Sequence, residues 1–205
     1  EYTGTWAWKI NGEWEYAAVD CSANTATNAE SLCAYPFCAP LQLQGVSSLR
    51  WDGSGTNGGK FVQIRANRDI ADLSRFGVGV ANNGGGTDGV EFTFPEISAA
   101  EGDQILLARE PATIAAYLGN CINQFDQVFE VSAMSQNGDD AIELFDGETV
   151  IETYGDANVD GTGQFWEYLN TWAFKTANVW NVADADCAQS ATTNSISPCP
   201  YGFCN

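Results

Sequence analysis

The sequence predicts an all-β protein built as an antiparallel β-sandwich. Three observations predict this class: short runs in which apolar and polar residues alternate, clusters of Gly, Asn and Asp between those runs, and one short helical candidate. Alternation with a period of two sends successive side chains to opposite faces of a strand, so each run can cover one side of a core. Turn clusters that follow one another at short intervals are typical of sandwiches and barrels.

The expected elements follow in chain order. Residues 41–46 and 60–65 alternate as half-buried strands do, and the turn-rich residues 52–59 separate them. Pro111 stands where the first turn of a helix tolerates proline, which predicts a helix over residues 112–118. The further expected strands cover residues 76–80, 90–94, 104–108, 128–131, 141–145, 149–154, 166–174 and 179–182.

The first 38 residues recur at the end of the chain with a constant offset of 166 positions. Residues 1–9 read EYTGTWAWK and residues 167–175 read EYLNTWAFK, while the spacing of the cysteines and of Trp14 is the same in both copies. A fixed long period indicates an array of structural units, and 166 residues suffice for a domain with its own core. We therefore expect the sequence to begin inside a repeat of a longer polypeptide.

This period sets the expected domain organisation. Residues 1–21 are expected to be the closing strands of a preceding repeat, and residues 22–40 a Cys-rich connector. Residues 41–186 would form the sandwich, and residues 187–205 the connector to the next repeat. The N-terminal strands would either stack on this sandwich or complete a neighbouring sheet by strand addition. The side chains expected at contacts between units are Trp6, Trp8, Trp14, Trp172 and Trp180.

The cysteines predict disulfides and an oxidising, secreted setting. One period holds four of the seven cysteines, which fits two bridges per unit in any of three pairings. A zinc site is the alternative, but it usually needs a C-x-x-C pair or His, and the chain has no His. All seven are therefore expected in bridges within or between units: Cys21, Cys33, Cys38, Cys121, Cys187, Cys199 and Cys204.

The charge balance narrows the function classes. With 27 acidic and 8 basic residues the net charge is −19, so we expect no nucleic acid and no anionic membrane as partner. No apolar run is long enough to span a membrane. Without His there is no Ser–His or Cys–His nucleophile, and no pair of carboxylates stands out for glycoside hydrolysis. We therefore expect no enzymatic activity.

Residues 156–167 follow the spacing of a twelve-residue calcium loop. Gly161 permits the sharp turn at position six, and Glu167 at position twelve can bind bidentately. The alternative is a Gly-Asp turn that caps a hairpin and matches the spacing by coincidence. The expected ligands of a Ca²⁺ cofactor are Asp156, Asn158, Asp160, Thr162 and Glu167.

Two further loops combine glycine with carboxylates. Residues 82–89 could hold an anion with backbone amides, but no basic residue follows, and a solvated hairpin tip is the competing interpretation. Asp139 and Asp140 could bind a cation, or they could hydrogen-bond the backbone of their own turn.

Several motifs in order resemble one known family. NRDIADLS at residues 67–74, NNGGGTDGVEFTFP at 82–95 and NGDDAIELF at 137–145 are similar to the bacterial lamin-tail-like domains of secreted proteins. The resemblance covers roughly residues 41–175 and implies an immunoglobulin-like β-sandwich without an active site. The Cys-rich connectors and the 166-residue period depart from the family's usual context.

Together these features predict a non-enzymatic structural protein, extracellular or on the cell surface. Its sandwiches would join head to tail into a fibre or stalk through disulfides, strand contacts and Ca²⁺, so its main partners would be copies of itself. One alternative is an adhesion or carbohydrate-binding module that recognises surface glycans. The other is an accessory domain of a secreted nuclease or phosphatase.

Overall fold

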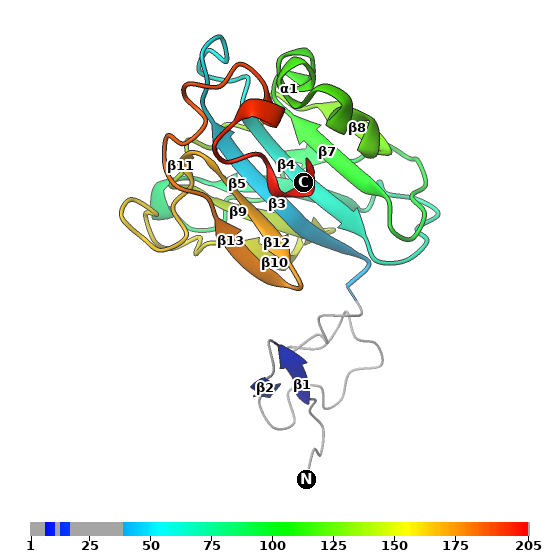
Figure 1. Cartoon of the computed structure of the whole chain (residues 1–205). Helices are drawn as coiled ribbons and strands as arrows, with labels where there is room; N and C mark the ends of the chain where they lie inside the picture. The colour runs from blue at the N-terminus through cyan, green and yellow to red at the C-terminus, as the bar shows by residue number, and fades with distance from the viewer. Residues whose placement is uncertain (1–6, 11–12, 17–38, 205) are drawn as a thin grey trace, which may run out of the picture.

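The computed structural model describes residues 7–10, 13–16 and 39–204. Within these residues the chain forms two β-sheets packed face to face, with a third layer of helix and loop on the outer side of the larger sheet (Figure 1). A separate two-stranded hairpin comprises β1 (Ala7–Ile10) and β2 (Glu13–Tyr16).

The larger sheet has seven strands in the order β13-β12-β3-β4-β7-β8, and β11 pairs with β3 beyond the end of β12. Its neighbours are antiparallel except β7 with β8 and β3 with β11, which are parallel. These strands are β3 (Leu41–Leu49), β4 (Lys60–Ala66), β7 (Gln104–Ala108), β8 (Gln127–Glu130), β11 (Leu169–Asn170), β12 (Trp172–Thr176) and β13 (Val179–Val182).

The smaller sheet has four antiparallel strands in the order β10-β9-β5-β6. These are β5 (Phe76–Ala81), β6 (Phe92–Thr93), β9 (Ala141–Asp146) and β10 (Thr149–Tyr154). The predicted two-sheet sandwich is therefore confirmed, while the two parallel pairs of the larger sheet differ from the wholly antiparallel expectation.

Helical structure is short. Helix α1 (Pro111–Leu118) begins with the predicted proline in its first turn and ends at Gly119, whose φ of 60° lies in the left-handed region. The 3₁₀ turns are η3 (Asn82–Gly84), η4 (Gly119–Gln124), η5 (Asn194–Ile196) and η6 (Gly202–Cys204).

The main core fills the space between the two sheets. Alternate side chains of β3, β4 and β7 point into it from one side, and β5 and β9 supply the other side. Leu43, Ile64 and Ile105 are fully buried there against Val78 and Leu144.

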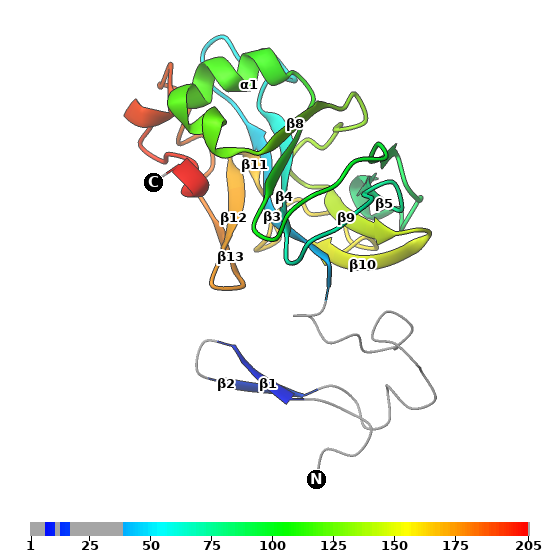
Figure 2. The same cartoon turned by 90° about the vertical axis from the view of Figure 1, so that its right-hand side faces the viewer.

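A second core lies on the other face of the larger sheet. Phe61 and Leu106 point outward from β4 and β7, where Ile114 of α1 and Tyr201 near the C-terminus cover them. In Figure 2 the red C-terminal segment and the smaller sheet lie on opposite sides of β3 and β4. The central strands are thus buried on both faces, although their sequences alternate as if one face met water.

Candidate assembly site

Residues 167–204, here called the closing segment, are the part of the sandwich that the sequence repeats at residues 1–38. Its strand β12 lies between β3 and β13 and so extends the larger sheet at the β3 side. In the register of this contact, Ala173 faces Val46 and Phe174 faces Gly45. Backbone hydrogen bonds give the segment its position along the sheet.

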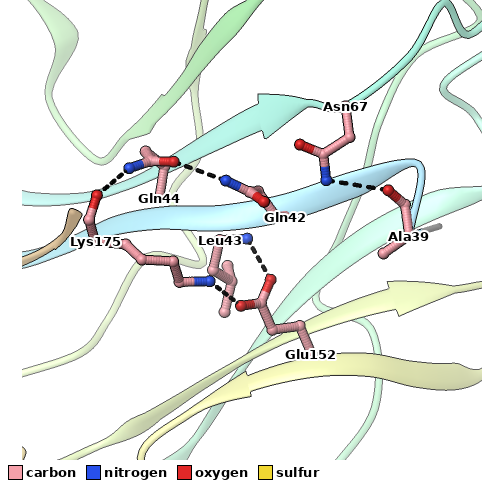
Figure 3. Close-up of polar contacts among 7 residues, drawn as sticks. All are labelled: Ala39, Gln42, Leu43, Gln44, Asn67, Glu152 and Lys175. Atoms are coloured by element: carbon pink, nitrogen blue, oxygen red, sulfur yellow. Dashed lines mark hydrogen bonds and ion pairs between the residues drawn. The ribbon is translucent and has the colours of Figure 1, made fainter. Parts of the chain in front are cut away.

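A buried ion pair fixes the segment to the smaller sheet. Lys175 of β12 is 8 % exposed and pairs through Nζ with Oε1 of Glu152 on β10 (Figure 3). The other carboxylate oxygen, Oε2, accepts a hydrogen bond of 2.6 Å from the backbone N–H of Leu43. Both β3 and β10 change register beside these residues, and such bulges free N–H groups from the ladder. One carboxylate therefore ties three strands together.

Amide side chains extend this network along β3. Gln44 donates to the backbone oxygen of Lys175, and Gln42 donates to Gln44 over 2.9 Å. At the start of the sandwich, Asn67 donates from its side chain to the oxygen of Ala39 over 3.0 Å and from its backbone to the oxygen of Pro40 over 2.9 Å. The two residues before β3 are thus held on the sandwich, as Figure 3 shows for Ala39.

The predicted contact tryptophans of the closing segment lie within the sandwich. Trp180 packs against Tyr154 with ring centroids 4.5 Å apart, and Nζ of Lys175 lies 4.9 Å above its indole. Trp172 donates through Nε1 to the oxygen of Cys199 over 3.1 Å. The other predicted contact residues are not described as side chains: Trp6 lies outside the described residues, and Trp8 and Trp14 are known only as backbone positions of β1 and β2.

Tyr201 anchors the end of the closing segment. It is fully buried and donates a hydrogen bond of 2.7 Å from its hydroxyl to Oε1 of Gln63. Burial holds the pKa of its phenol well above the usual value, because the phenolate would lose its hydration. Gly45 makes room for this ring, since a Cβ there would lie 1.8 Å from the hydroxyl oxygen. Sequence reasoning noted Tyr201 as part of the repeat but missed this role.

Two disulfides lock the closing segment. Cys121, beside α1, bonds to Cys204 across 83 positions, and Cys187 bonds to Cys199 across 12. The bridges settle one of the three possible pairings for the described cysteines and indicate that the chain folds where thiols are oxidised. Cys21, Cys33 and Cys38 lie outside the described residues, as does the expected connector 22–40 except for Ala39 and Pro40.

The stretch predicted as the connector to a next repeat packs on the sandwich as far as it is described. Ala188 and Tyr201 are fully buried in the second core, and Asn194 is 3 % exposed. Asn194 accepts a hydrogen bond of 2.7 Å from the backbone of Tyr201. Residues 187–204 therefore belong structurally to the unit that precedes them.

The predicted calcium loop forms a series of local turns. Asp156 accepts the backbone N–H of Asn158 over 2.9 Å, and Asp160 accepts that of Thr162 over 2.9 Å, which lowers the pKa of Asp160. Glu167 accepts a backbone N–H over 2.8 Å in the same way. Within residues 39–204 and the described hairpin, no group of three acidic, Cys or His side chains could hold a metal ion. Calcium binding by this loop stays a prediction, which a calorimetric titration tests.

Three loops, which contain Gly86, Asp139 and Ala157, meet at the end of the sandwich where the predicted calcium loop lies. Gly86 donates its backbone N–H to the oxygen of Ala157 over 2.8 Å, and Gly161 donates to the oxygen of Asp139 over 2.9 Å. Asp140 accepts backbone N–H groups from Asn137 and Asn83, in keeping with the turn interpretation. Burial nevertheless raises the pKa of Asp140. The anion site considered for residues 82–89 stays untested.

An aromatic hollow of about 490 Å³ lies beside the closing segment. Tyr154, Trp166 and Trp180 line it together with the side chain of Phe165, which is 92 % exposed. Asp156 and Gln164 supply polar groups at its wall. Sequence reasoning singled out Trp180 but not Phe165, although an adjacent Phe-Trp pair after a glycine-rich loop was the signal that could have identified it.

Comparison with known proteins gave no match: no family model, no curated protein and no solved structure matches the chain. In the described part of the chain, no helix combines the length and the apolar character that crossing a membrane needs.

Proposed function

We propose that the chain is a non-enzymatic, extracellular structural protein whose lamin-tail-like sandwiches join head to tail into a fibre or surface stalk. The observation that carries this proposal is that hairpin β1–β2 repeats hairpin β12–β13 in register as well as in sequence. Lys9 faces Trp14 in the first hairpin, as Lys175 faces Trp180 in the second. The other three facing pairs correspond in the same way. Ala7–Tyr16 corresponds to Ala173–Val182, Trp8–Glu15 to Phe174–Asn181, and Ile10–Glu13 to Thr176–Val179.

This match supports an assembly of like units. The second hairpin is an integral edge of a sandwich, while the strands of the first pair with each other in a sheet of their own. A hairpin of the same register as β12–β13 can join the sheet of another sandwich by strand addition, as β12 joins β3 in this one. The natural partner is therefore another sandwich of the same kind.

Other features support the extracellular setting. Two disulfides stabilise the described part of the chain, and disulfides persist in secreted proteins rather than in a reducing cytosol. The net charge of −19 keeps such units soluble and is compatible with saline surroundings, where salt screens repulsion between neighbours.

The immunoglobulin-like and lamin-tail-like assignments are part of the same proposal. Their support is the two-sheet sandwich and the places that the family's motifs take in it. NGDDAIELF at residues 137–145 supplies the turn around Asp140 and most of β9, the central partner of β5. The carboxylate of Glu91, in the motif at 82–95, accepts the backbone N–H of Val80 over 2.9 Å. These motif residues hold turns and strands, which suits a module without catalysis.

Electron microscopy of material from the native source tests the proposal. We expect threads with a regular axial repeat and, on an unreduced denaturing gel, species much larger than one 22.0 kDa chain. Dispersed globular particles without an axial repeat would contradict it.

The aromatic hollow favours a second function, a glycan-binding module. Sugars stack their apolar faces on exposed aromatic rings, and Phe165 with Trp180 offers such rings beside a carboxylate. On a glycan array, Phe165→Ala would abolish retention of any bound saccharide. Ile196→Ala, which removes another exposed apolar side chain away from the hollow, would leave it unchanged. Equal retention by both variants would contradict this function.

A further inference from the structure

The aromatic hollow beside the closing segment combines aromatic rings with a carboxylate, and none of the described residues that line it is Lys or Arg. We infer that this hollow binds a trimethylammonium group, such as the head of choline, with the cation against the rings and beside Asp156. This inference rests on the binding function proposed for the hollow and names the chemical group that the hollow takes.

The inner wall of the hollow is built before any ligand arrives. Tyr154 is buried, and its hydroxyl donates a hydrogen bond of 2.6 Å to the backbone oxygen of Trp166. Gly155 and Gly161 make room for the indole of Trp166, since a Cβ on either would lie within 2.8 Å of its ring carbons. Trp180 completes the wall by packing against Tyr154. Rings fixed in this way cost a ligand little ordering when it binds.

Phe165 forms the rim. The backbone N–H of Gln164 donates to the oxygen of Gly161 over 2.9 Å, and that of Glu167 donates to the oxygen of Gln164 over 3.1 Å. Between these turns Trp166 is buried, whereas Phe165 stays almost fully exposed. Its ring can cover one side of a ligand in the hollow, and the negative face of an aromatic ring attracts a cation.

The charges around the hollow favour a cation. Asp156 is exposed, and its Oδ1 accepts the backbone N–H of Asn158 over 2.9 Å, which leaves Oδ2 for a ligand. The ammonium group of Lys175 lies 4.9 Å from the ring of Trp180, but Glu152 neutralises it. The net charge of −19 also draws cations towards the chain and repels anions.

The contact between Lys175 and Trp180 shows the same chemistry inside the chain, because an ammonium group there meets an indole ring and a carboxylate. The hollow offers rings and a carboxylate again, with few hydrogen-bond acceptors. A primary ammonium group has three N–H donors to satisfy, whereas a trimethylammonium group has none and presents methyl groups to the rings. The volume of about 490 Å³ is typical of small-molecule sites and leaves room for the molecule that carries the group.

The test is a titration of the full ¹⁵N-labelled chain with choline, followed by the indole N–H signals of Trp166 and Trp180 in nuclear magnetic resonance spectra. A parallel titration uses dimethylbutanol, the uncharged isostere of choline in which a carbon atom replaces the nitrogen. We expect choline to shift both signals and to bind at least about tenfold more tightly than the alcohol. This preference should fall as the salt concentration rises, because salt screens the carboxylate of Asp156.

Two matched pairs of variants locate the site. Asp156→Asn should weaken choline binding by up to about fivefold and leave the alcohol unchanged. Its control is Asp160→Asn, which removes the same charge and the same kind of turn hydrogen bond from this loop outside the hollow and should change neither affinity. Phe165→Leu keeps an exposed apolar side chain without a ring, so it should weaken choline more than the alcohol, while Ile196→Ala should affect neither.

Choline could come from a lipid headgroup or from a soluble compound, and cosedimentation with phosphatidylcholine vesicles tells these sources apart. We expect the protein to stay in the supernatant, because its negative charge repels the phosphate next to each choline. Protein in the pellet would assign the site to a lipid headgroup instead.

Equal affinities for choline and the alcohol, or no shift of either indole signal with choline, would overturn the inference. Equal losses from Asp156→Asn and Asp160→Asn would also overturn it, because the preference would then come from the net charge of the chain. A saccharide that the wild type retains and Phe165→Ala does not, without choline binding, would refute this inference and leave the glycan-binding function standing. Choline binding without retention of any saccharide would do the reverse.

Discussion

Tyr201 donates a hydrogen bond of 2.7 Å to Oε1 of Gln63, although 138 positions separate the two residues. Both are fully buried, and Gln63 in turn donates to Gln104 over 2.7 Å. Tyr201 also meets Phe61 edge-on at 5.0 Å between centroids. The end of the closing segment is therefore built into the outer face of the larger sheet.

Removing the hydroxyl of Tyr201 should show how much its hydrogen bond to Gln63 contributes to stability. Tyr201→Phe leaves Oε1 of Gln63 buried without its donor, so the free energy of unfolding should fall by about 1–3 kcal/mol. Urea unfolding followed by tryptophan fluorescence measures the loss. The double variant Tyr201→Phe/Gln63→Leu should lose less than the sum of the two single variants, because each single change orphans a polar group. Additive losses would contradict the contact.

A substitution at Gly45 tests the close packing of β3 against the ring of Tyr201. In Gly45→Ala the new Cβ would lie 1.8 Å from Oη of Tyr201, so the ring must move, at about 1–3 kcal/mol of stability. Thermal unfolding should show a lower midpoint. Gly85→Ala is the control, since its nearest neighbour would lie at 3.2 Å in an exposed loop. Equal unfolding midpoints for the two variants would contradict the close packing of Tyr201 against β3.

The two ion pairs in the described part of the chain should contribute very different amounts to the free energy of unfolding. Lys175→Met leaves the carboxylate of Glu152 without its counter-ion in a largely buried place, which should cost about 3 kcal/mol. Arg75→Met breaks the pair with Asp146, where the arginine side chain is 63 % exposed, and should cost at most about 1 kcal/mol. Chemical denaturation of both variants at one salt concentration measures the difference. The reverse order would contradict the buried network.

The two disulfides should contribute unequally, because a longer closed loop restricts the unfolded chain more. Loop-closure entropy gives about 4.5 kcal/mol for Cys121–Cys204 and about 3 kcal/mol for Cys187–Cys199. Paired Cys→Ser variants of each bridge, unfolded in guanidinium chloride, measure both. A larger loss from the short bridge would mean that the closing segment depends mainly on its own internal loop.

Buried tyrosines predict unfolding at high pH. Burial raises the pKa of Tyr154, Tyr168 and Tyr201 above the usual value near 10, so the folded state keeps protons that the unfolded state gives up. Their contribution is complete below about pH 10 and falls as the pH rises further, by about 1.4 kcal/mol per pH unit for each phenol. Absorbance at the phenolate band should rise cooperatively with loss of near-ultraviolet dichroism. Gradual ionisation in folded protein would contradict this.

The strands were predictable where alternation has one local cause. Residues 41–46 and 60–65 alternate because one face meets the core, and the structure confirms them as parts of β3 and β4. Their outer faces are also buried, but only because α1 and the closing segment fold back over them. A period of two does not reveal that second cover. The parallel pairing of β7 with β8 was missed for a related reason, since strand partners depend on where the chain returns.

Only part of the candidate assembly site could be predicted from the sequence. The repeat identified Trp172 and Trp180, whose aromatic size and spacing stand out, but it could not name Glu152 and Gln63 as the partners of Lys175 and Tyr201. Those partners belong to distant strands, and only the packing of the sheets brings them together. The cysteines were equally incomplete information, because the sequence permits three pairings of four thiols and the fold selects one.

The Cys121–Cys204 bridge also sets how far a unit can stretch. A pull applied at Leu41 and Cys204 passes along the chain to Cys121 and leaves through the sulfur atoms, so the residues between the two cysteines carry no load. Those 83 steps withhold about 290 Å of contour length, roughly half of what the unit could otherwise release. In a thread of such units, each unit that unfolds with its disulfide intact would lengthen the thread by a short step. Reduction of the disulfide would about double the length that each unit releases.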